Sequence, residues 1–208
     1  IGGAPFILVL PGSRQGEVAR LSPVFGAALT LVLAKNPDAR VMVVAAPPVA
    51  DAVQAATSHW AARPITLDPS GLSPRAAQLQ KRIAFASADV ALAASGTVSL
   101  ELAAAATPTV IAYKLNWLSW QIMSRMVRVD TVTLVNLVTG SRSVPEFLGR
   151  NCQPAAIATA LIELMNNDAL KKLQRDAMRE TMTLLGRGGP APGSRAANAV
   201  LDGMRDEP

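Results

Sequence analysis

The sequence predicts an α/β fold: a doubly wound, mostly parallel sheet over residues 1–150, followed by C-terminal helices over 151–208. Apolar runs of strand length alternate with segments of helical length along the first part of the chain. These runs are continuous, as strands covered by helices on both faces of a parallel sheet require. Half of the 208 residues are hydrophobic, which is enough for the large core of such a domain.

The first five strands and the helices between them can be placed from these runs. The first strand is "PFILVL" (5–10), and its helix extends to about Lys35. Two prolines open the segment 47–61, where they suit the first turn of a helix. "TVTLVN" (131–136) is expected to be a sixth strand or an extended segment. The other strands are expected at 39–46, 63–68, 89–95 and 108–114, and the other helices at 74–87, 97–106 and 116–127.

The last part of the chain has a helical pattern. One helix is expected over 153–167, and a charged helix runs from Asp168 toward Gly186, which can end it in the left-handed conformation. A loop rich in glycine and proline then leads to a final helix, with Ser194 as its expected N-cap.

The composition narrows the classes of partner. A formal charge of +5 favours anionic partners such as phosphates, nucleotides or acidic lipid head groups. We expect no nucleic-acid partner, because the basic residues are scattered and Tyr113 is the only tyrosine. Cys152 and His59 are each the only residue of their type, so we expect no disulfide framework, no metal site and no cofactor.

The nearly apolar segment 90–114 is too interrupted to be a membrane span. The turn Ser95-Gly96-Thr97 and then Glu101 break it, whereas a span needs about 20 predominantly apolar residues. The N-terminus lacks the features of a signal peptide, and with a single cysteine a reducing, cytoplasmic setting is the default expectation. It also begins so close to a core strand that we expect the chain to be a piece of a longer protein.

Two small-residue turns are expected to meet at one place. In the strand order 3-2-1-4-5, strands 1 and 4 are neighbours, and the connections leaving them diverge to open a crevice. Gly12-Ser13-Arg14 follows the first strand, and Ser95-Gly96-Thr97 follows the fourth. Each turn opens a helix, so both are expected to face the same cleft.

The residues of these turns suit a diphosphate. A helix N-terminus presents free N–H groups and a partial positive charge, and glycine lets the backbone approach a ligand closely. Ser13, Ser95 and Thr97 add hydroxyl groups, and Arg14 adds a charged guanidinium. The alternative for the second turn is an ordinary helix N-cap that binds no ligand.

Glu101 lies one helical turn beyond Thr97 and can face the same cleft. A carboxylate repels phosphates, so its expected partner is a neutral diol such as a ribose. The alternative is an ordinary surface carboxylate. The sequence has no G-x-G-x-x-G after the first strand and no G-x-x-x-x-G-K-[ST], which disfavours a nicotinamide enzyme and a phosphate-cleaving motor.

Several stretches together resemble the C-terminal half of the lipid-A-disaccharide synthase family. They occur in order over essentially the whole chain: "LPGSRQGEV" (10–18), "ASGTVSLELAAAATPTVIAYK" (94–114), "LVNLV" (134–138), "VPEFLG" (144–149) and "GSRAANAVL" (193–201). The resemblance implies an inverting glycosyltransferase with two Rossmann-like domains, the GT-B architecture. The implied reaction moves 2,3-diacylglucosamine from UDP to 2,3-diacylglucosamine 1-phosphate. Its products are the β-1,6 disaccharide 1-phosphate of lipid A and UDP.

The resemblance also implies a set of donor-binding residues. Tyr113 and Lys114 fall at the rim of the cleft, where Lys114 can offset phosphate charge. Asn136 belongs with Pro145 and Glu146 to the last motif, and it is either a hydrogen-bonding cleft residue or a plain turn asparagine. The implied donor site is Gly12, Ser13, Arg14, Glu17, Ser95, Gly96, Thr97, Glu101, Tyr113, Lys114, Asn136 and Glu146.

The segment 116–128 admits two interpretations. It is either a core or interdomain helix, or a surface that meets acyl chains or the membrane interface, where tryptophan and arginine are favourable. The residues considered for lipid or membrane contact are Trp117, Trp120, Met123, Arg125 and Arg128.

The family has an N-terminal domain that carries the acceptor site and the expected catalytic base, so the resemblance implies a fragment with little or no turnover alone. The implied partners are the UDP-diacylglucosamine donor, an acylated sugar phosphate acceptor, the N-terminal domain, and the cytoplasmic face of the inner membrane. A homodimer that exchanges C-terminal helices is left open. The alternatives are another GT-B UDP-sugar enzyme, such as a muramyl-type glycosyltransferase or a UDP-N-acetylglucosamine epimerase, or a non-catalytic module with this fold.

Overall fold

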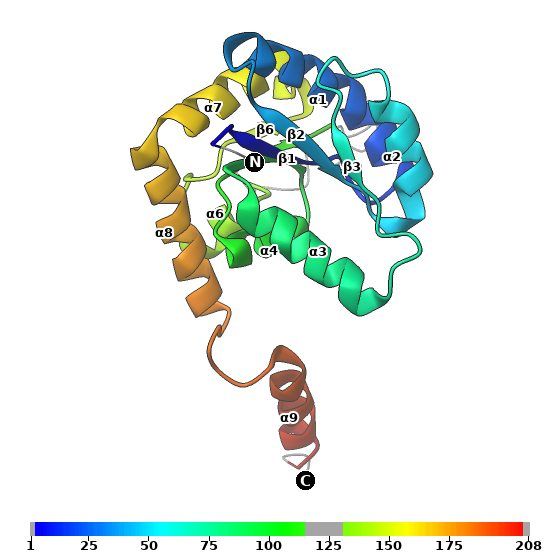
Figure 1. The fold of residues 1–208 in the computed structure, drawn as a ribbon. Coiled ribbons are helices and arrows are strands. Elements are labelled where there is room, and N and C mark those ends of the chain that lie inside the picture. Colours follow the sequence, from blue (N-terminus) through cyan, green and yellow to red (C-terminus); the bar gives the residue numbers. More distant parts are fainter. Residues whose placement is uncertain (1–2, 115–130, 206–208) are drawn as a thin grey trace.

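The structure is a computed structural model of the chain, and it describes residues 3–114 and 131–205. Within these residues, six parallel strands form one sheet in the order β3-β2-β1-β4-β5-β6 (Figure 1). The predicted doubly wound α/β fold, with the first and fourth strands side by side, is confirmed. The strands are β1 (Phe6–Leu10), β2 (Arg40–Val44), β3 (Ile65–Leu67), β4 (Val90–Ala94), β5 (Thr109–Tyr113) and β6 (Glu146–Leu148).

Helices cover both faces of this sheet. A single turn of 3-10 helix, η1 (Pro47–Val49), carries the two prolines expected at a helix start, and η2 (Gly149–Asn151) follows β6. The α-helices are α1 (Gln15–Lys35), α2 (Ala50–Thr57), α3 (Pro74–Ser87), α4 (Val98–Ala105), α6 (Leu134–Thr139), α7 (Pro154–Asn166), α8 (Asp168–Leu184) and α9 (Pro192–Arg205).

Two hydrophobic clusters lie on opposite faces of the sheet. One gathers α1, α2 and α7, where Phe25 and Leu161 pack with strand residues such as Ile7. The other gathers α3, α4, α6 and α8, where Met178 packs with Leu8. Because β1 sends alternate side chains into both clusters, all five of its residues are buried. This explains the continuous apolar runs, since burying one such side chain contributes about 1.5–3 kcal/mol.

Helix α1 is long and apolar enough to cross a membrane by length and composition alone. Its buried side chains recur every three or four residues, at Val18, Leu21, Phe25, Leu29 and Val32. This spacing forms one stripe, which packs against the sheet and α7. The burial of that stripe identifies α1 as a core helix of the domain.

The expected strand or extended segment at 131–136 is wrong from Leu134 on, where helix α6 begins, whereas Thr133 just before it is extended. The carboxylate of Glu146 accepts hydrogen bonds from the backbone N–H groups of Val132 and Thr133, just before the helix begins. Gly140 then ends α6 in the left-handed conformation, with φ of +63°. The place beside β5 is taken by β6, in which Glu146 pairs with Ile111.

The C-terminal helices follow the expected course with one correction. Gly186 has a φ of +88° just beyond α8, so the predicted left-handed stop is confirmed. Ser194 is not the N-cap of the last helix, because α9 already begins at Pro192 and Ser194 lies in its first turn. Helix α9 extends away from the rest of the molecule (Figure 1), and its side chains Val200, Leu201 and Met204 are exposed.

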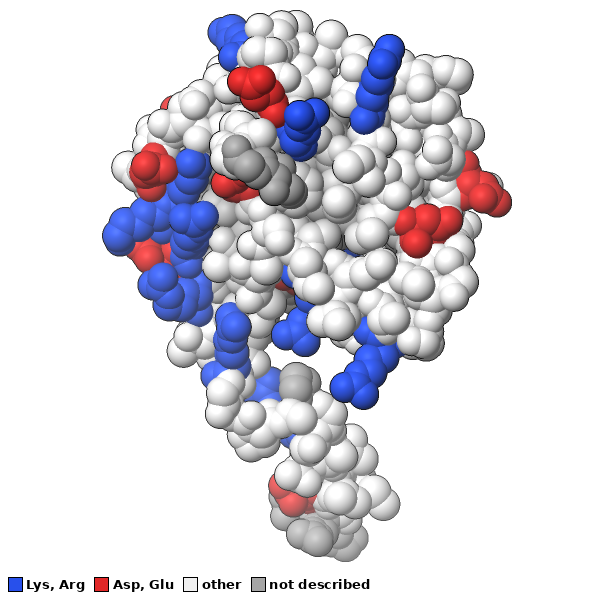
Figure 2. All heavy atoms as spheres, in the orientation of Figure 1, with Lys and Arg blue, Asp and Glu red and all other residues white. Residues whose placement is uncertain are grey.

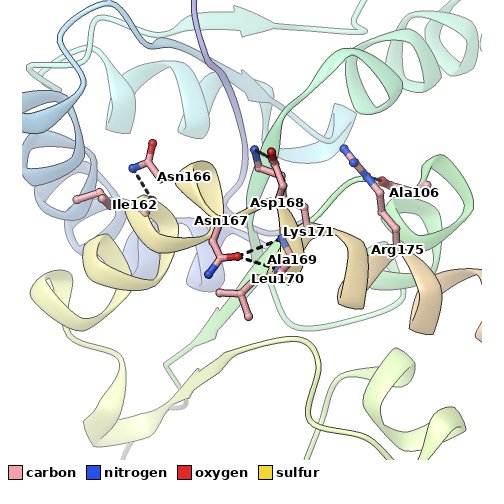
Figure 3. A network of polar contacts seen from close by, with 9 residues as sticks. All are labelled: Ala106, Ile162, Asn166, Asn167, Asp168, Ala169, Leu170, Lys171 and Arg175. Carbon is pink, nitrogen blue, oxygen red and sulfur yellow. Dashed lines mark hydrogen bonds and ion pairs between the residues drawn. The ribbon is translucent and has the colours of Figure 1, made fainter.

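The junction between α7 and α8 fixes α8 over the sheet (Figure 3). The side-chain oxygen of Asn167 accepts hydrogen bonds from the backbone N–H groups of Ala169 and Leu170, which caps the new helix. Further along α8, Arg175 donates to the carbonyl of Ala106, the left-handed residue that ends α4. Helix α8 therefore supports the C-terminal end of α4.

Lys and Arg side chains gather over α8 (Figure 2), a local exception to the scattered distribution expected from the sequence. Much of this charge is paired within the helix. Lys171 contacts Asp168, and Asp176 contacts both Lys172 and Arg179 at 2.7 and 3.0 Å. These exposed pairs are worth little each, but they leave less free positive charge than the composition of α8 suggests.

Two glycines of α1 provide a direct test of this packing. A Cβ at Gly26 would lie 2.6 Å from Nε1 of the buried Trp60 ring, whereas one at the exposed Gly16 would approach only the flexible end of Arg20, at 3.1 Å. Gly26→Ala is expected to lower the free energy of unfolding by about 1–3 kcal/mol through overpacking. Gly16→Ala is expected to be neutral or to stabilise by up to about 1 kcal/mol. Urea denaturation measures both, and equal effects of the two substitutions would contradict the packing of Trp60 on α1.

Candidate functional site

A cleft of about 590 Å³ opens at the carboxyl ends of β1 and β4. The two small-residue turns both line it, which is the convergence expected from the sequence. One contributes Gly12, Ser13 and Arg14, and the other contributes Ser95, Gly96 and Thr97. Helix α3 and the ends of β2 and β3 complete the walls. This is the switch point of a doubly wound sheet, where ligands bind in such folds.

Each turn requires its glycine. Gly12 has a φ of +119° and Gly96 a φ of +149°, both in the region that favours glycine. A Cβ at Gly96 would meet no atom within 4 Å, so this backbone borders open space in the cleft. A Cβ at Gly12 would lie 2.7 Å from Oε2 of Glu17. The first glycine thus makes room for a side chain of the chain itself, and the second leaves room for a ligand.

The N-terminus of α1 already holds an anion, the carboxylate of Glu17. Its Oε2 accepts from the backbone N–H of Ser13 at 3.0 Å, and its Oε1 accepts from Arg14 Nη1 at 3.0 Å. Glu17 is only 7% exposed, so this carboxylate is part of the floor of the cleft. The expectation that both turns present only donors to a phosphate therefore changes, because the Glu17 carboxylate lies within the first turn.

The N-terminus of α4 has a different character. Thr97 is the N-cap residue, but its side chain makes no capping hydrogen bond. The Thr97 side chain therefore does not cap the helix, and the binding of a ligand at this turn stays a prediction. The hydroxyl of Ser99 bonds back to the carbonyl of Gly96, at 2.9 Å. Gly96, Thr97 and Val98, the residues at this helix end, all line the cleft, as a site for a phosphate requires.

Glu101 lines the cleft and forms an ion pair with Lys81 of α3, at 2.7 Å between Nζ and Oε2. Nothing in the sequence singles out Lys81. No motif contains it, and only the path of α3 along the edge of the cleft brings it to Glu101. Among the described residues, the charged groups that line the cleft are therefore two cations, Arg14 and Lys81, and two anions, Glu17 and Glu101.

Tyr113 and Lys114 lie behind the cleft rather than in its lining. The Tyr113 hydroxyl donates to Oε1 of Glu17 at 3.4 Å. Burial and the neighbouring Glu17 carboxylate raise the pKa of Tyr113, while Arg20 and Arg14 act in the opposite direction. Lys114 is exposed, and its carbonyl accepts a hydrogen bond from Arg20. Tyr113 reaches the cleft through Glu17, and the predicted contacts of both residues with a donor stay a prediction.

Asn136 and Glu146 are not brought to the cleft. Asn136 is fully buried, and its side chain bonds both the N–H and the carbonyl of Val144, at 3.0 and 2.9 Å. Glu146 bonds Thr131 Oγ1 at 2.6 Å, in addition to the backbone ahead of α6. Both side chains hold the loops around α6 in place, so the geometry gives Asn136 a structural position instead of the expected place in the cleft.

The residues considered for lipid or membrane contact, within 116–128, lie outside the described residues, so that expectation stays untested. Among the described residues, no group of three His, Cys, Asp or Glu side chains could hold a metal ion. The chemistry available in the described cleft is hydrogen bonding and charge, supplied by the two turns and by α3.

The doubly wound sheet is a Rossmann-like α/β domain, the class of fold that GT-B glycosyltransferases contain. The C-terminal domain of a glycosyl transferase group 1 family protein from Francisella tularensis has the same fold, with a TM-score of 0.54 and 14% identity; the match covers 88% of this chain and 86% of that one. A UDP-GlcNAc 2-epimerase from Neisseria meningitidis bound to UDP-GlcNAc matches with a TM-score of 0.55 and 13% identity, over 89% of this chain and 45% of that one.

The chain belongs to the lipid-A-disaccharide synthetase family, whose family model matches residues 3–197. The resemblance found in the motifs is thereby confirmed. A lipid-A-disaccharide synthase of Ruegeria pomeroyi is 58% identical over 202 residues, which are 97% of this chain and 50% of that protein. One of Rhodospirillum centenum is 41% identical over 96% of this chain and 48% of that protein. The chain thus spans about half the length of these curated relatives.

The contact between Glu17 and Tyr113 can be tested by titration, because Tyr113 is the only tyrosine. We expect its pKa to lie above that of a free tyrosine, chiefly through burial and then through Glu17. Glu17→Gln should lower this pKa without returning it fully, since burial remains. Difference absorbance of tyrosinate measures the change, and Glu101→Gln, which does not contact Tyr113, should leave it unaltered.

The raised pKa of Tyr113 also makes the free energy of unfolding depend on pH. The folded chain holds the phenolic proton more tightly than the unfolded chain, because the pKa of Tyr113 is raised on folding. The resulting stability is fully present below the pKa of an unfolded tyrosine and is lost as the pH rises through the folded-state pKa. Glu17→Gln should narrow the pH range between the unfolded-state and folded-state pKa values of Tyr113, over which this stability is lost. If the Tyr113 pKa were the same in the unsubstituted chain and in the Glu17→Gln variant, the position of Glu17 beside Tyr113 would be contradicted.

Proposed function

We propose that the cleft binds the UDP part of a UDP-2,3-diacylglucosamine donor, and that the chain is the donor-binding half of a lipid-A-disaccharide synthase. The full enzyme would transfer the acylated sugar, with inversion, to 2,3-diacylglucosamine 1-phosphate and release UDP. The observation that carries the proposal is the meeting of Arg14, Gly96, Thr97 and Glu101 in one cleft of a chain that belongs to this family.

The proposed arrangement follows from the chemistry of the walls. The diphosphate lies at the N-terminus of α4, beside Gly96 and Thr97, where Arg14 can add its guanidinium from across the cleft. The ribose diol meets Glu101. The uracil ring lies against the apolar wall at the ends of β2 and β3, where Val44 and Leu67 line the cleft. The fold is shared with an epimerase bound to UDP-GlcNAc, which agrees with a UDP-sugar in such a cleft.

The interactions are sufficient for useful affinity. A helix N-terminus contributes about 0.3–2 kcal/mol and a hydrogen bond to a charged group about 1.5–3 kcal/mol. Two or three such contacts, with the base and ribose, correspond to dissociation constants of roughly micromolar to millimolar. In transfer, the same groups would stabilise the negative charge that develops on UDP as the bond to the sugar breaks.

The proposal assigns the rest of the reaction to the part of the protein outside this chain. An inverting transfer needs a base that deprotonates the acceptor hydroxyl on the face opposite the departing UDP. Glu17 and Glu101, the two carboxylates of the cleft, are engaged by Arg14 and Lys81. We therefore assign the base and the acceptor site to the remaining half, and we expect the exposed apolar face of α9 to pack against it. The acylated substrates would bring the full enzyme to the cytoplasmic face of the inner membrane.

Binding of UDP to this chain tests the donor site. Arg14→Ala and Glu101→Ala are each expected to weaken UDP binding about tenfold or more, because each removes a contact to a charged group. Isothermal titration calorimetry measures the affinities. Arg179→Ala on α8, which removes an equal charge far from the cleft lining, should leave binding unchanged. Binding of NAD with no binding of UDP would contradict the proposal.

The reaction itself is tested by reuniting the two halves. Mixing this chain with the separately produced N-terminal half and both acylated substrates is expected to give the disaccharide 1-phosphate and UDP, whereas this chain alone gives little or none. Mass spectrometry detects the product. If both halves are folded and UDP binds, yet no disaccharide forms from these substrates, the proposed substrates are wrong although the nucleotide site stands.

A further inference from the structure

Lys81 holds the Glu101 carboxylate through both of its oxygens. Nζ lies 3.0 Å from Oε1 and 2.7 Å from Oε2, so the ammonium group sits on one side of the carboxylate. The two residues come from different helices, α3 and α4, and both line the cleft. The pair therefore forms part of the cleft wall, where α3 and α4 approach each other.

The position of the ammonium group is itself supported by the core. Nζ lies 5.4 Å from the centroid of the Phe85 ring, one turn further along α3. Phe85 is 2% exposed and packs in the cluster under α3 and α4. A cation over an aromatic face is attracted by the ring, so Phe85 favours the conformation of Lys81 that reaches Glu101.

A carboxylate held in this way has a defined set of free acceptor sites. Each carboxylate oxygen has two lone pairs, and the ammonium group uses one of them on each oxygen. The ammonium lies on the side that the two oxygens share, so the remaining lone pairs point away from each other, and a ribose hydroxyl can donate to one of them. The ammonium also offsets the repulsion between this carboxylate and a nearby diphosphate.

We propose that Lys81 is a positioning residue, which holds Glu101 so that a free lone pair of its carboxylate accepts a hydrogen bond from a ribose hydroxyl of the donor. The inference rests on the proposed function and deepens it, because it assigns the preference for a ribose over a deoxyribose to a residue outside the recognised motifs. The other role open to Lys81, direct contact with a phosphate, predicts a different result and is an outcome of the test.

The ion pair is exposed enough to be changed without unfolding the chain. The side chains of Lys81 and Glu101 are 35% and 49% exposed, and ion pairs of this kind contribute little to stability. The experiment measures the affinities of UDP and 2′-deoxy-UDP by calorimetry and takes their ratio. We expect the unsubstituted chain to prefer UDP about tenfold or more, since the deoxy compound loses a hydrogen bond to a charged group.

Lys81→Met is expected to reduce this ratio to near one, as Glu101→Gln should, and the double variant should lose no more than either alone. Lys81→Arg should retain part of the preference. Arg82→Met is the matched control, because Arg82 is the next residue of α3, carries the same charge, is exposed and lies outside the cleft lining. It should leave the ratio unchanged.

The outcomes separate this inference from the function on which it rests. A Lys81→Met variant that weakens UDP and 2′-deoxy-UDP equally would overturn the positioning role and indicate a phosphate contact. A variant with unchanged affinities and ratio would overturn it as well. Failure of the unsubstituted chain to bind UDP would overturn the proposed function and this inference together. Thermal unfolding of each variant shows that the folded state is retained.

Discussion

The parallel pairing of β1 with β4 is the constraint on which the site depends. Ile7 pairs with Val90 and Leu10 with Ala93, so the two strands end side by side at the same edge of the sheet. The chain leaves β1 toward the face covered by α1 and leaves β4 toward the face covered by α4. Because these connections diverge, no backbone fills the space between them, and the turns at Gly12 and Gly96 border one cleft.

The two turns are alike in sequence but differ in what they hold. At the start of α1 the carboxylate of Glu17 accepts from the backbone N–H of Ser13 and from the guanidinium of Arg14, so this turn already holds an anion that belongs to the chain. At α4 the side chain of Thr97 makes no capping bond. A helix end with a built-in anion is stable without a ligand, while one without is available to bind one. The cleft therefore has one wall, at Glu17, that is held by bonds within the chain, and one wall, at Thr97, that can bind a ligand.

Much of the fold and the placement of the two turns could be predicted, because they depend on local patterns. Continuous apolar runs identify buried strands, and a glycine after a strand marks a turn. Asn136 and Lys81 could not be placed in this way. The buried hydrogen bonds of Asn136 depend on where the loop at Val144 returns to α6, and the contact of Lys81 depends on how α3 lies beside α4. The extended segment expected at 131–136 failed for the same reason, since Glu146 arrives from later in the chain to begin a helix there.

The cleft also joins parts of the molecule that are otherwise held by separate cores. Arg14 and Glu17 lie at the start of α1, which packs on one face of the sheet, whereas Lys81 and Glu101 belong to α3 and α4 on the other. α4 is supported in turn at its far end, where Arg175 of α8 bonds to Ala106. A ligand that contacts both walls therefore binds only when the sheet between them is folded. Such a ligand adds to the stability of the whole domain, by about 2.7 kcal/mol at a hundred times its dissociation constant. The geometry of the cleft therefore depends on both hydrophobic clusters being folded.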